Sequence, residues 1–289
     1  MISLITVNYN DSMVTREFVE RIVSFEDISH IIVVDNHSSD GSFSILEELG
    51  RIYEKVDVIE SGKNGGYGYG NNYGIRYAVE KYHSDALLIS NPDVFFDNYA
   101  VRRMKAVLDT QADAAVAAPV SKDCYGRYCR QAAWRIPKSG WGFIFMDAPL
   151  VRYLLRGRYY YKIRDLRSES RIEVDAVSGA LLMLRAADVV RAGYYDEELF
   201  LYCEESVLAM KLKAIGRRSF LLTNIQYMHH PSTTILKSYR TFLQRMQLLW
   251  KSKEIVLKKY YGFHGLRLVV FYIARKFCYV YAWVRGLLA

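Results

Sequence analysis

The stretch H-I-I-V-V-D-N-H-S-S-D-G-S (residues 30–42) decides the fold class. Its first six residues are mainly β-branched and apolar and end in Asp35, a pattern typical of a buried strand. The Asn, Ser, Asp and Gly residues that follow favour a turn, and a helix is expected from about residue 42 to 50. Strand, polar turn and helix in this order indicate one unit of an α/β fold.

The same unit recurs along the first 120 residues, with a strand about every 25 to 30 residues and helical patterns between them. This alternation predicts a doubly wound, mostly parallel sheet flanked by helices. Strands are expected at Ile2–Val7, His30–Asp35, Lys55–Ile59, Ala86–Ser90 and Ala114–Ala118, and helices at 14–24, 42–50, from the end of a loop at Asn64–Asn72 to Tyr82, and 98–109.

The second half of the chain is less regular. Residues 121–172 are rich in Arg, Tyr and Trp and show few regular periods. After them the pattern predicts two strands around Ser178-Gly179, a helix within Asp196–Ile215, strand segments at 219–222 and 225–228, and helices at 236–260 and 264–287. We therefore expect one domain over 1–235, with halves at 1–120 and 121–235, and a helical tail over 236–289.

Polar side chains follow the expected strands of the first half at their carboxyl ends. Asn8 and Asn10, Asp35, Asn64 and Asp93 all occupy such positions. Ligands of parallel sheets bind beyond the carboxyl ends of the strands, so these residues are expected to share one composite pocket.

Three of these polar segments have alternative interpretations. Asp35 could accept a hydrogen bond from a pyrimidine base or a ribose, or it could only shape a turn. The run Asn64–Asn72 could approach a diphosphate at a helix N-terminus, or it could be a flexible loop. Asn91-Pro92-Asp93 could hold Mg²⁺ or Mn²⁺ through oxygen ligands, or it could be a Pro-Asp turn without a metal.

Two further clusters lie outside the first half. Glu204 and Glu205 stand at a helix start, where the helix dipole favours acids, and one of them could act as a general base. His229 and His230 follow a short strand and could bind a metal or a phosphate, or they could be structural.

Six segments in this order resemble family 2 glycosyltransferases, particularly the bacterial rhamnosyltransferase-like branch. The matching segments are I-T-V-N-Y-N (5–10), I-V-V-D-N-H-S-S-D-G-S (32–42), N-G-G-Y-G-Y-G-N-N-Y-G (64–74), N-P-D (91–93), S-G-A-L-L-M-L-R (178–185) and G-Y-Y-D-E-E-L-F-L-Y-C-E-E (193–205). The resemblance implies a GT-A fold and transfer of a sugar, with inversion, from a nucleotide-sugar donor. It assigns donor binding to 1–120 and the acceptor and catalysis to 121–235.

The resemblance also implies roles for single residues. Those that would contact the nucleotide are Thr6, Asn8, Asn10, Asp35, Asn64, Gly65 and Asn91. Asp93 would bind the metal, with His229 or His230 close to it. Glu205 would be the catalytic base, beside Glu204, and Asp196 would shape the acceptor side.

Two departures from the family pattern concern the base. Glu205 stands where the family usually has Asp, and Val207 stands where a further acid is common. These departures raise the alternative of a binding or scaffolding subunit with weakened catalysis. A nucleotidyltransferase is a further alternative, but Asn8–Asp11 lacks the Gly-rich, basic loop that such an enzyme needs after its first strand.

Charge distinguishes the tail from the body. Residues 236–289 hold eleven Lys and Arg and one acid, Glu254, whereas the rest of the chain has 28 basic and 30 acidic residues. Basic residues alternate with Tyr, Phe, Trp and Leu, which predicts a helix lying on an anionic membrane surface rather than a nucleic-acid partner. A helical cap or an oligomer contact are the alternatives.

The remaining expectations concern the compartment and the substrates. Four Cys without zinc spacing, and an N-terminus without a basic region, favour a reduced, cytoplasmic protein on the inner face of the cell membrane. No apolar run is long enough to span a bilayer, and Leu268–Ala274 is cut off by Arg275 and Lys276. The branch resemblance makes dTDP-rhamnose the expected donor, with a UDP-sugar as the alternative, and a polysaccharide, lipopolysaccharide or lipid-linked glycan the expected acceptor.

Overall fold

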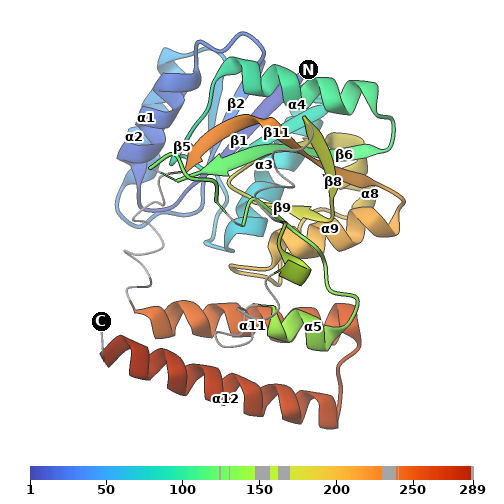
Figure 1. Ribbon diagram of the computed structural model, residues 1–289. Coiled ribbons are helices and arrows are strands. Elements are labelled where there is room, and N and C mark those ends of the chain that lie inside the picture. Colours follow the sequence, from blue (N-terminus) through green and yellow to red (C-terminus); the bar gives the residue numbers. More distant parts are fainter. Residues whose placement is uncertain are drawn as a thin grey trace.

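The structure is a computed structural model of the chain, and it describes residues 1–123, 125–129, 131–146, 157–161, 170–229, 239 and 241–287. A nine-stranded sheet forms its centre, in the order β3-β2-β1-β4-β10-β6-β11-β5, with β8 paired to β11 (Figure 1). The strands are β1 (Ile2–Asn8), β2 (His30–Asp35), β3 (Val56–Glu60), β4 (Ala86–Ser90), β5 (Val94–Phe95), β6 (Ala114–Lys122), β8 (Arg171–Val174), β10 (Leu181–Arg185) and β11 (Arg218–His229). A separate two-stranded sheet pairs β7 (Ala133–Trp134) with β9 (Ala176–Val177).

The first half of the sheet is parallel. Strand β1 pairs in parallel with β2 and with β4, and β2 pairs in parallel with β3. Strand β10 enters antiparallel between β4 and β6, and β11 then runs parallel to β6. The predicted α/β fold with a mostly parallel sheet is therefore confirmed.

Two layers of helices cover the sheet, because successive residues of each strand face opposite sides. Leu4 packs in one core with α1 (Ser12–Ile22), α2 (Ser42–Ile52) and α4 (Asn98–Thr110). Its neighbour Ile5 packs in the other core with α3 (Tyr67–Tyr82), α8 (Ala186–Ala192) and α9 (Glu204–Ala214). Both cores consist mainly of buried aliphatic residues, and they fix the carboxyl ends of β1, β2 and β4 at one edge.

Helix α3 begins earlier than expected. The run Asn64–Asn72 was expected to be a loop, but the helix starts at Tyr67. A Cβ added at Gly70 would lie 2.8 Å from the side chain of Val7, and one at Gly74 would lie 2.5 Å from that of Ile5. These glycines therefore let the helix lie directly against β1, and packing outweighs their low helix propensity.

The C-terminal residues form two long helices, as predicted. Helices α11 (Phe242–Tyr261) and α12 (Leu266–Leu287) lie side by side, with α12 on the outer side (Figure 1). Trp250 and Phe271 share a third core with Phe143 of α5 (Gly140–Phe145) and with Val207 of α9. The helical tail is thus packed on the body through a common core.

A buried lysine strengthens this packing. Lys253 on α11 is fully buried, and its Nζ donates to the carbonyl oxygens of Phe143 and Ile144 at 2.8 and 3.0 Å.

In the part of the chain that the structure describes, no helix combines the length and the hydropathy needed to cross a membrane.

Candidate functional site

Asn8 and Asp35 are direct neighbours at the ends of two parallel strands, and they are partners in the register of β1 and β2. Asn8 Nδ2 donates to Asp35 Oδ1 at 2.7 Å, while Thr15 Oγ1 donates to Asn8 Oδ1 at 2.9 Å. Asp35 is fully buried and also accepts from the backbone N–H and the hydroxyl of Ser38, at 2.8 and 2.7 Å. The carboxylate of Asp35 therefore holds Asn8 and the following turn in place.

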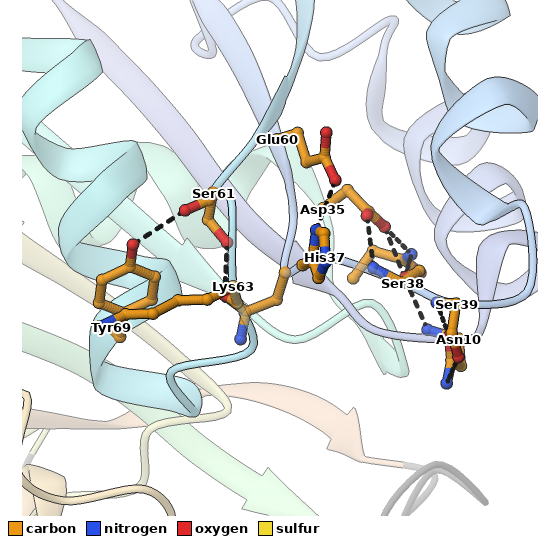
Figure 2. A network of polar contacts seen from close by, with 11 residues as sticks. Asn10, Asp35, His37, Ser38, Ser39, Glu60, Ser61, Lys63 and Tyr69 are labelled. Atoms are coloured by element: carbon orange, nitrogen blue, oxygen red, sulfur yellow. Dashed lines mark hydrogen bonds and ion pairs between the residues drawn. The ribbon is translucent and has the colours of Figure 1, made fainter.

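Two loops at this edge are joined to each other. The backbone N–H of Asn10 donates to Ser38 Oγ at 2.9 Å, and the backbone N–H of Ser39 donates to Asn10 Oδ1 at 2.8 Å (Figure 2). Asn10 adopts a positive φ of 51°, which Asn tolerates better than most residues. The loops after β1 and β2 thus form one rigid rim.

Asn36 connects this rim to the loop before α3. Its Nδ2 donates to Asn64 Oδ1 and to the carbonyl oxygen of Gly66, both at 3.1 Å, and its Oδ1 accepts from Ser61 Oγ at 2.9 Å. Asn36 was not among the predicted site residues, although an Asn directly after a strand end is the same signal that Asn8 gave.

Asp93 and His229 meet at the edge where β5 pairs with β11. Val94 and His229 are partners in the antiparallel register, and His229 Nε2 lies 3.4 Å from Asp93 Oδ1. The carboxylate of Asp93 is almost fully buried. His230 lies outside the described residues, so the structure places only His229 beside Asp93.

These segments surround one cavity of about 500 Å³ at the carboxyl edge of the strands. Five predicted residues line it: Asn8, Asn10, Asn64, Asn91 and Asp93. The remaining lining residues are Val7, Tyr9, Asp11, Thr15, Asn36, Gly66, Tyr67, Pro92, Phe200, Leu201 and Tyr239. Of the residues expected to share one pocket, Asn8, Asn10, Asn64 and Asp93 line this cavity and Asp35 does not. Its aromatic lining residues are Tyr9, Tyr67, Phe200 and Tyr239.

Three of the predicted nucleotide-binding residues lie outside the lining of this cavity. Thr6 is fully buried within β1, and Asp35 is fully buried beneath Asn8. Gly65 faces the ring of Tyr69, since a Cβ added at Gly65 would lie 2.3 Å from the Tyr69 Cγ. These positions support the wall of the cavity without forming its surface.

The donor set at Asp93 and His229 fits a divalent cation shared with a ligand. Carboxylate oxygen and imidazole nitrogen are both ligands of Mn²⁺, while Mg²⁺ prefers oxygen alone. Within the described residues, no group of three or more His, Cys, Asp and Glu is placed to hold a metal ion. A cation here would take its other ligands from water or from a bound phosphate.

Glu204 and Glu205 open α9 after two residues of strained backbone, because Tyr202 and Cys203 both have a φ of 73°. Glu204 is buried, and its Oε1 has no hydrogen-bond partner among the described residues. Burial, and then the charge of Glu205, raise the pKa of Glu204 well above its usual range. Such strain and desolvation are typical of functional sites.

Glu205 points toward the turn between β9 and β10. Its Oε1 accepts from the backbone N–H of Gly179 at 3.2 Å, and burial raises the pKa of its carboxyl group. Neither glutamate lines the 500 Å³ cavity. Tyr67 links the two places, because it lines the cavity and its hydroxyl donates to the carbonyl oxygen of Gly179 at 2.7 Å.

Asp196 contacts the C-terminal helices. Its Oδ2 accepts from the hydroxyl of Tyr260 at 2.7 Å and lies 2.9 Å from Lys259 Nζ. Burial opposes ionisation of Asp196, but these two partners hold its pKa below the usual value. The acid expected on the acceptor side thus anchors α11.

The family model described as "Glycosyl transferase family 2" matches residues 3–188 of the chain. The chain belongs to glycosyltransferase family 2. Among curated relatives, rhamnosyltransferase WbbL of Escherichia coli K12 is 25% identical over 263 residues, which cover 86% of this chain and 95% of the relative. An N-acetylglucosaminyl-diphospho-decaprenol L-rhamnosyltransferase of Mycobacterium tuberculosis is 26% identical over 208 residues, covering 69% of this chain and 66% of the relative.

Solved structures with the same fold are GT-A glycosyltransferases. The mannosyltransferase PcManGT of Pyrobaculum calidifontis, in complex with GDP-Man and Mn²⁺, has a TM-score of 0.60 at 13% identity and covers 100% of this chain and 75% of its own. S. aureus TarS 1–349 in complex with UDP-GlcNAc has a TM-score of 0.56 at 18% identity, covering 89% of this chain and 66% of its own. The predicted GT-A fold is confirmed.

The structure gives a packing reason for the departure at Val207. Val207 is fully buried in the core that α9 shares with Trp250 and Phe271. A carboxylate at this position would be buried among apolar side chains at a high cost in free energy. Packing of the C-terminal helices therefore gives a structural reason for an apolar residue at position 207.

Proposed function

We propose that this glycosyltransferase moves a sugar from a nucleotide-sugar donor to a hydroxyl of a glycan acceptor, with inversion at the anomeric carbon. One observation carries the proposal: a single cavity collects Asn8, Asn64 and Asn91 together with Asp93, which His229 touches from β11. This cavity brings the amide groups of these residues close to the carboxylate of Asp93, and His229 lies behind that carboxylate.

The donor would span this cavity. The base and the ribose would lie at the rim formed by Asn8, Asn10 and Asn36, where amide groups can donate and accept hydrogen bonds. The diphosphate would lie toward Asp93 and His229. A divalent cation held by these two residues would neutralise the charge that develops on the leaving diphosphate. Solved GT-A relatives in complex with Mn²⁺ support this role for a metal.

Glu205 would act as the general base. In the reaction, the acceptor hydroxyl oxygen bonds to the anomeric carbon, and the bond from that carbon to the diphosphate oxygen breaks. The bonding electrons leave with the diphosphate, and Glu205 takes the proton of the hydroxyl. A carboxyl group whose pKa is raised by burial is a stronger base toward this proton than an exposed one.

The names of the relatives guide the choice of substrates. Rhamnosyltransferases are found among them, one named a dTDP-rhamnosyl transferase, and the name of another specifies a lipid diphosphate carrying N-acetylglucosamine as acceptor. We therefore propose dTDP-rhamnose as the donor, with a UDP-sugar as the alternative. The proposed acceptor is a lipid-linked glycan of surface polysaccharide or lipopolysaccharide synthesis.

The outer face of α12 would hold the protein on an anionic membrane, at its cytoplasmic side. Large apolar residues are exposed every three or four positions along this helix, at Leu266, Val270, Ile273, Phe277, Val280 and Val284. Arg267 and Lys276 are exposed beside them. A lipid surface with negative headgroups satisfies both the apolar stripe and these charges.

Part of the positive charge of the tail is already neutralised within the protein. Glu254 pairs with Lys258 and Arg275 at 2.6 and 2.9 Å, and Lys259 pairs with Asp196 and Glu198 at 2.9 and 2.7 Å. Membrane binding would therefore depend mainly on the apolar stripe, with a smaller electrostatic part than the sequence suggested.

The function is tested by screening nucleotide sugars for thermal stabilisation in the presence of Mn²⁺ or Mg²⁺. A ligand that binds only the folded state raises the melting temperature by mass action. The proposal predicts stabilisation by dTDP-rhamnose or a UDP-sugar that depends on the metal. Stabilisation by no nucleotide sugar, or equal stabilisation by every nucleoside triphosphate, would contradict it.

A further inference from the structure

The turn Ser178–Gly179–Ala180, between β9 and β10, contacts three parts of the site at once. The carbonyl oxygen of Gly179 accepts from the Tyr67 hydroxyl at 2.7 Å, and its N–H donates to Glu205 Oε1 at 3.2 Å. The carbonyl oxygen of Ala180 accepts from the N–H of Asn91 at 2.9 Å. One turn therefore joins the cavity wall, the proposed base and the segment that carries Asp93.

These contacts leave no space around Gly179. A Cβ added there would lie 2.5 Å from Glu205 Oε1 and 3.0 Å from the Tyr67 hydroxyl oxygen. Because glycine has more backbone freedom than other residues, its orientation here depends on the groups that bond to it. The phenol of Tyr67 is the side chain that holds its carbonyl group.

We propose that Tyr67 is a positioning residue for the transfer reaction: its hydroxyl fixes Gly179, and Gly179 in turn orients Glu205. This inference rests on the proposed role of Glu205 as base. Tyr67 is suited to it because it belongs both to the donor cavity and to the turn, so a donor in the cavity contacts the same side chain that sets the base.

Tyr69 provides a matched control from the same glycine-rich run. Its hydroxyl donates to the carbonyl oxygen of Ser61, the residue directly after β3, at 2.8 Å (Figure 2). Both variants, Tyr67→Phe and Tyr69→Phe, remove one part-buried hydrogen bond from an aromatic residue of α3. Only the bond lost in Tyr67→Phe is made to Gly179, the residue that contacts Glu205.

The kinetic test compares these two variants with the unchanged protein, using dTDP-rhamnose, Mn²⁺ and a synthetic N-acetylglucosaminyl diphospholipid. Tyr67→Phe is expected to lower kcat about five- to tenfold, as for a lost hydrogen bond that matters in the transition state. The KM for the donor should stay within about twofold, because the ring still forms the cavity wall. Tyr69→Phe should leave both constants unchanged.

The pH dependence separates positioning from a loss of stability. The N–H of Gly179 favours the ionised form of Glu205 and so lowers its pKa. A loosened Gly179 donates less well, so the acidic limb of kcat should move to higher pH in Tyr67→Phe. The proposal would be overturned if the acidic limb of kcat did not move in Tyr67→Phe, or if Tyr69→Phe lost kcat to the same extent.

A measurement without substrate tests the same contact. Protein labelled with ¹³C-carbonyl serine and ¹⁵N-glycine shows the amides of the three Ser-Gly pairs, those of Gly62, Gly140 and Gly179. The signal of Gly179 is the one whose titration with pH is lost in Glu205→Gln. The inflection should lie at higher pH in Tyr67→Phe than in the unchanged protein and in Tyr69→Phe. Equal inflections overturn the inference even when transfer is active. If no donor is transferred but the inflection moves, the contact is supported and the proposed function fails.

Discussion

His229 Nε2 lies 3.4 Å from Asp93 Oδ1, because β11 pairs antiparallel with β5 and brings His229 beside the carboxylate that lines the cavity. Asp93 and His229 are far apart in the sequence, so only the fold brings them together. In the proposed function, the pair would supply an oxygen and a nitrogen ligand to a cation beside the diphosphate of the donor.

Replacing Asp93 by Ala should remove the metal-dependent part of donor binding. The remaining imidazole of His229 cannot hold Mn²⁺ firmly alone, so the affinity for dTDP-rhamnose with Mn²⁺ should fall to the value measured with EDTA. Isothermal titration calorimetry with and without the metal measures this. Asp97→Ser, which keeps the N-cap of α4, is the control and should bind as before. If Asp93→Ala still binds the donor in an Mn²⁺-dependent way, Asp93 is not the metal ligand.

Glu205→Gln should bind the donor normally and lose transfer. Gln keeps the size of the side chain and can accept the bond from Gly179, but it cannot take a proton. The expected loss in kcat is about 10²- to 10⁴-fold, the usual contribution of a general base. Turnover at the rate of the unchanged protein would exclude Glu205 as the base.

Glu204→Gln should make the fold more stable at neutral pH. The pKa of Glu204 is raised in the folded state, so the protonated form is favoured there and stability is lost as pH rises from the ordinary value of 4.5 through the folded pKa. Gln removes this loss. Calorimetry should therefore show a melting temperature a few degrees higher at pH 8, with the gain shrinking toward pH 4. A lower melting temperature at pH 8 would show that the charge of Glu204 stabilises the fold.

Charges placed on the outer face of α12 should release the protein from anionic vesicles. Phe277 and Val280 are 72% and 60% exposed, so the double variant Phe277→Glu, Val280→Glu should fold normally. In a flotation assay with phosphatidylglycerol vesicles it should remain in the dense fraction. The control is the double variant Met13→Glu, Ile52→Glu, whose sites on α1 and α2 are 61% and 58% exposed. If the α12 variant still floats with the vesicles, the outer face of α12 is not the membrane-binding surface.

Substitutions are preferable here to deletion of the tail. Trp250 and Phe271 share a core with Phe143, Leu199 and Val207 of the body. Removing α11 and α12 would expose that core, and loss of folding would then hide any effect on membrane binding.

The sequence predicted the sheet well where strands are short apolar runs between turn residues. The bounds of β2 and β4 agree with the expected His30–Asp35 and Ala86–Ser90. The start of α3 was missed because glycines disfavour helices, and their close approach to Val7 and Ile5 is a tertiary contact. Helix α8 was missed because its seven residues are too few to show a clear period.

The candidate site was predictable where residues follow strand ends. Asn8, Asn64 and Asp93 do so, and they meet in the cavity. Asp35 follows the same rule, yet its carboxylate bonds to Asn8 and Ser38 beneath the surface. Tyr67 could not be assigned from the sequence, since its role depends on a bond to a turn more than a hundred residues away in the chain.

The most direct test of transfer by this site is a reaction followed by NMR. The protein, or its Asp93→Ala variant, is incubated with dTDP-β-L-rhamnose, Mn²⁺ and a synthetic N-acetylglucosaminyl diphospholipid, and the anomeric signal of the product is recorded. The account predicts an α-linked rhamnoside, formed by the unchanged protein and lost in Asp93→Ala. A β-linked product, or equal product from both proteins, would contradict it.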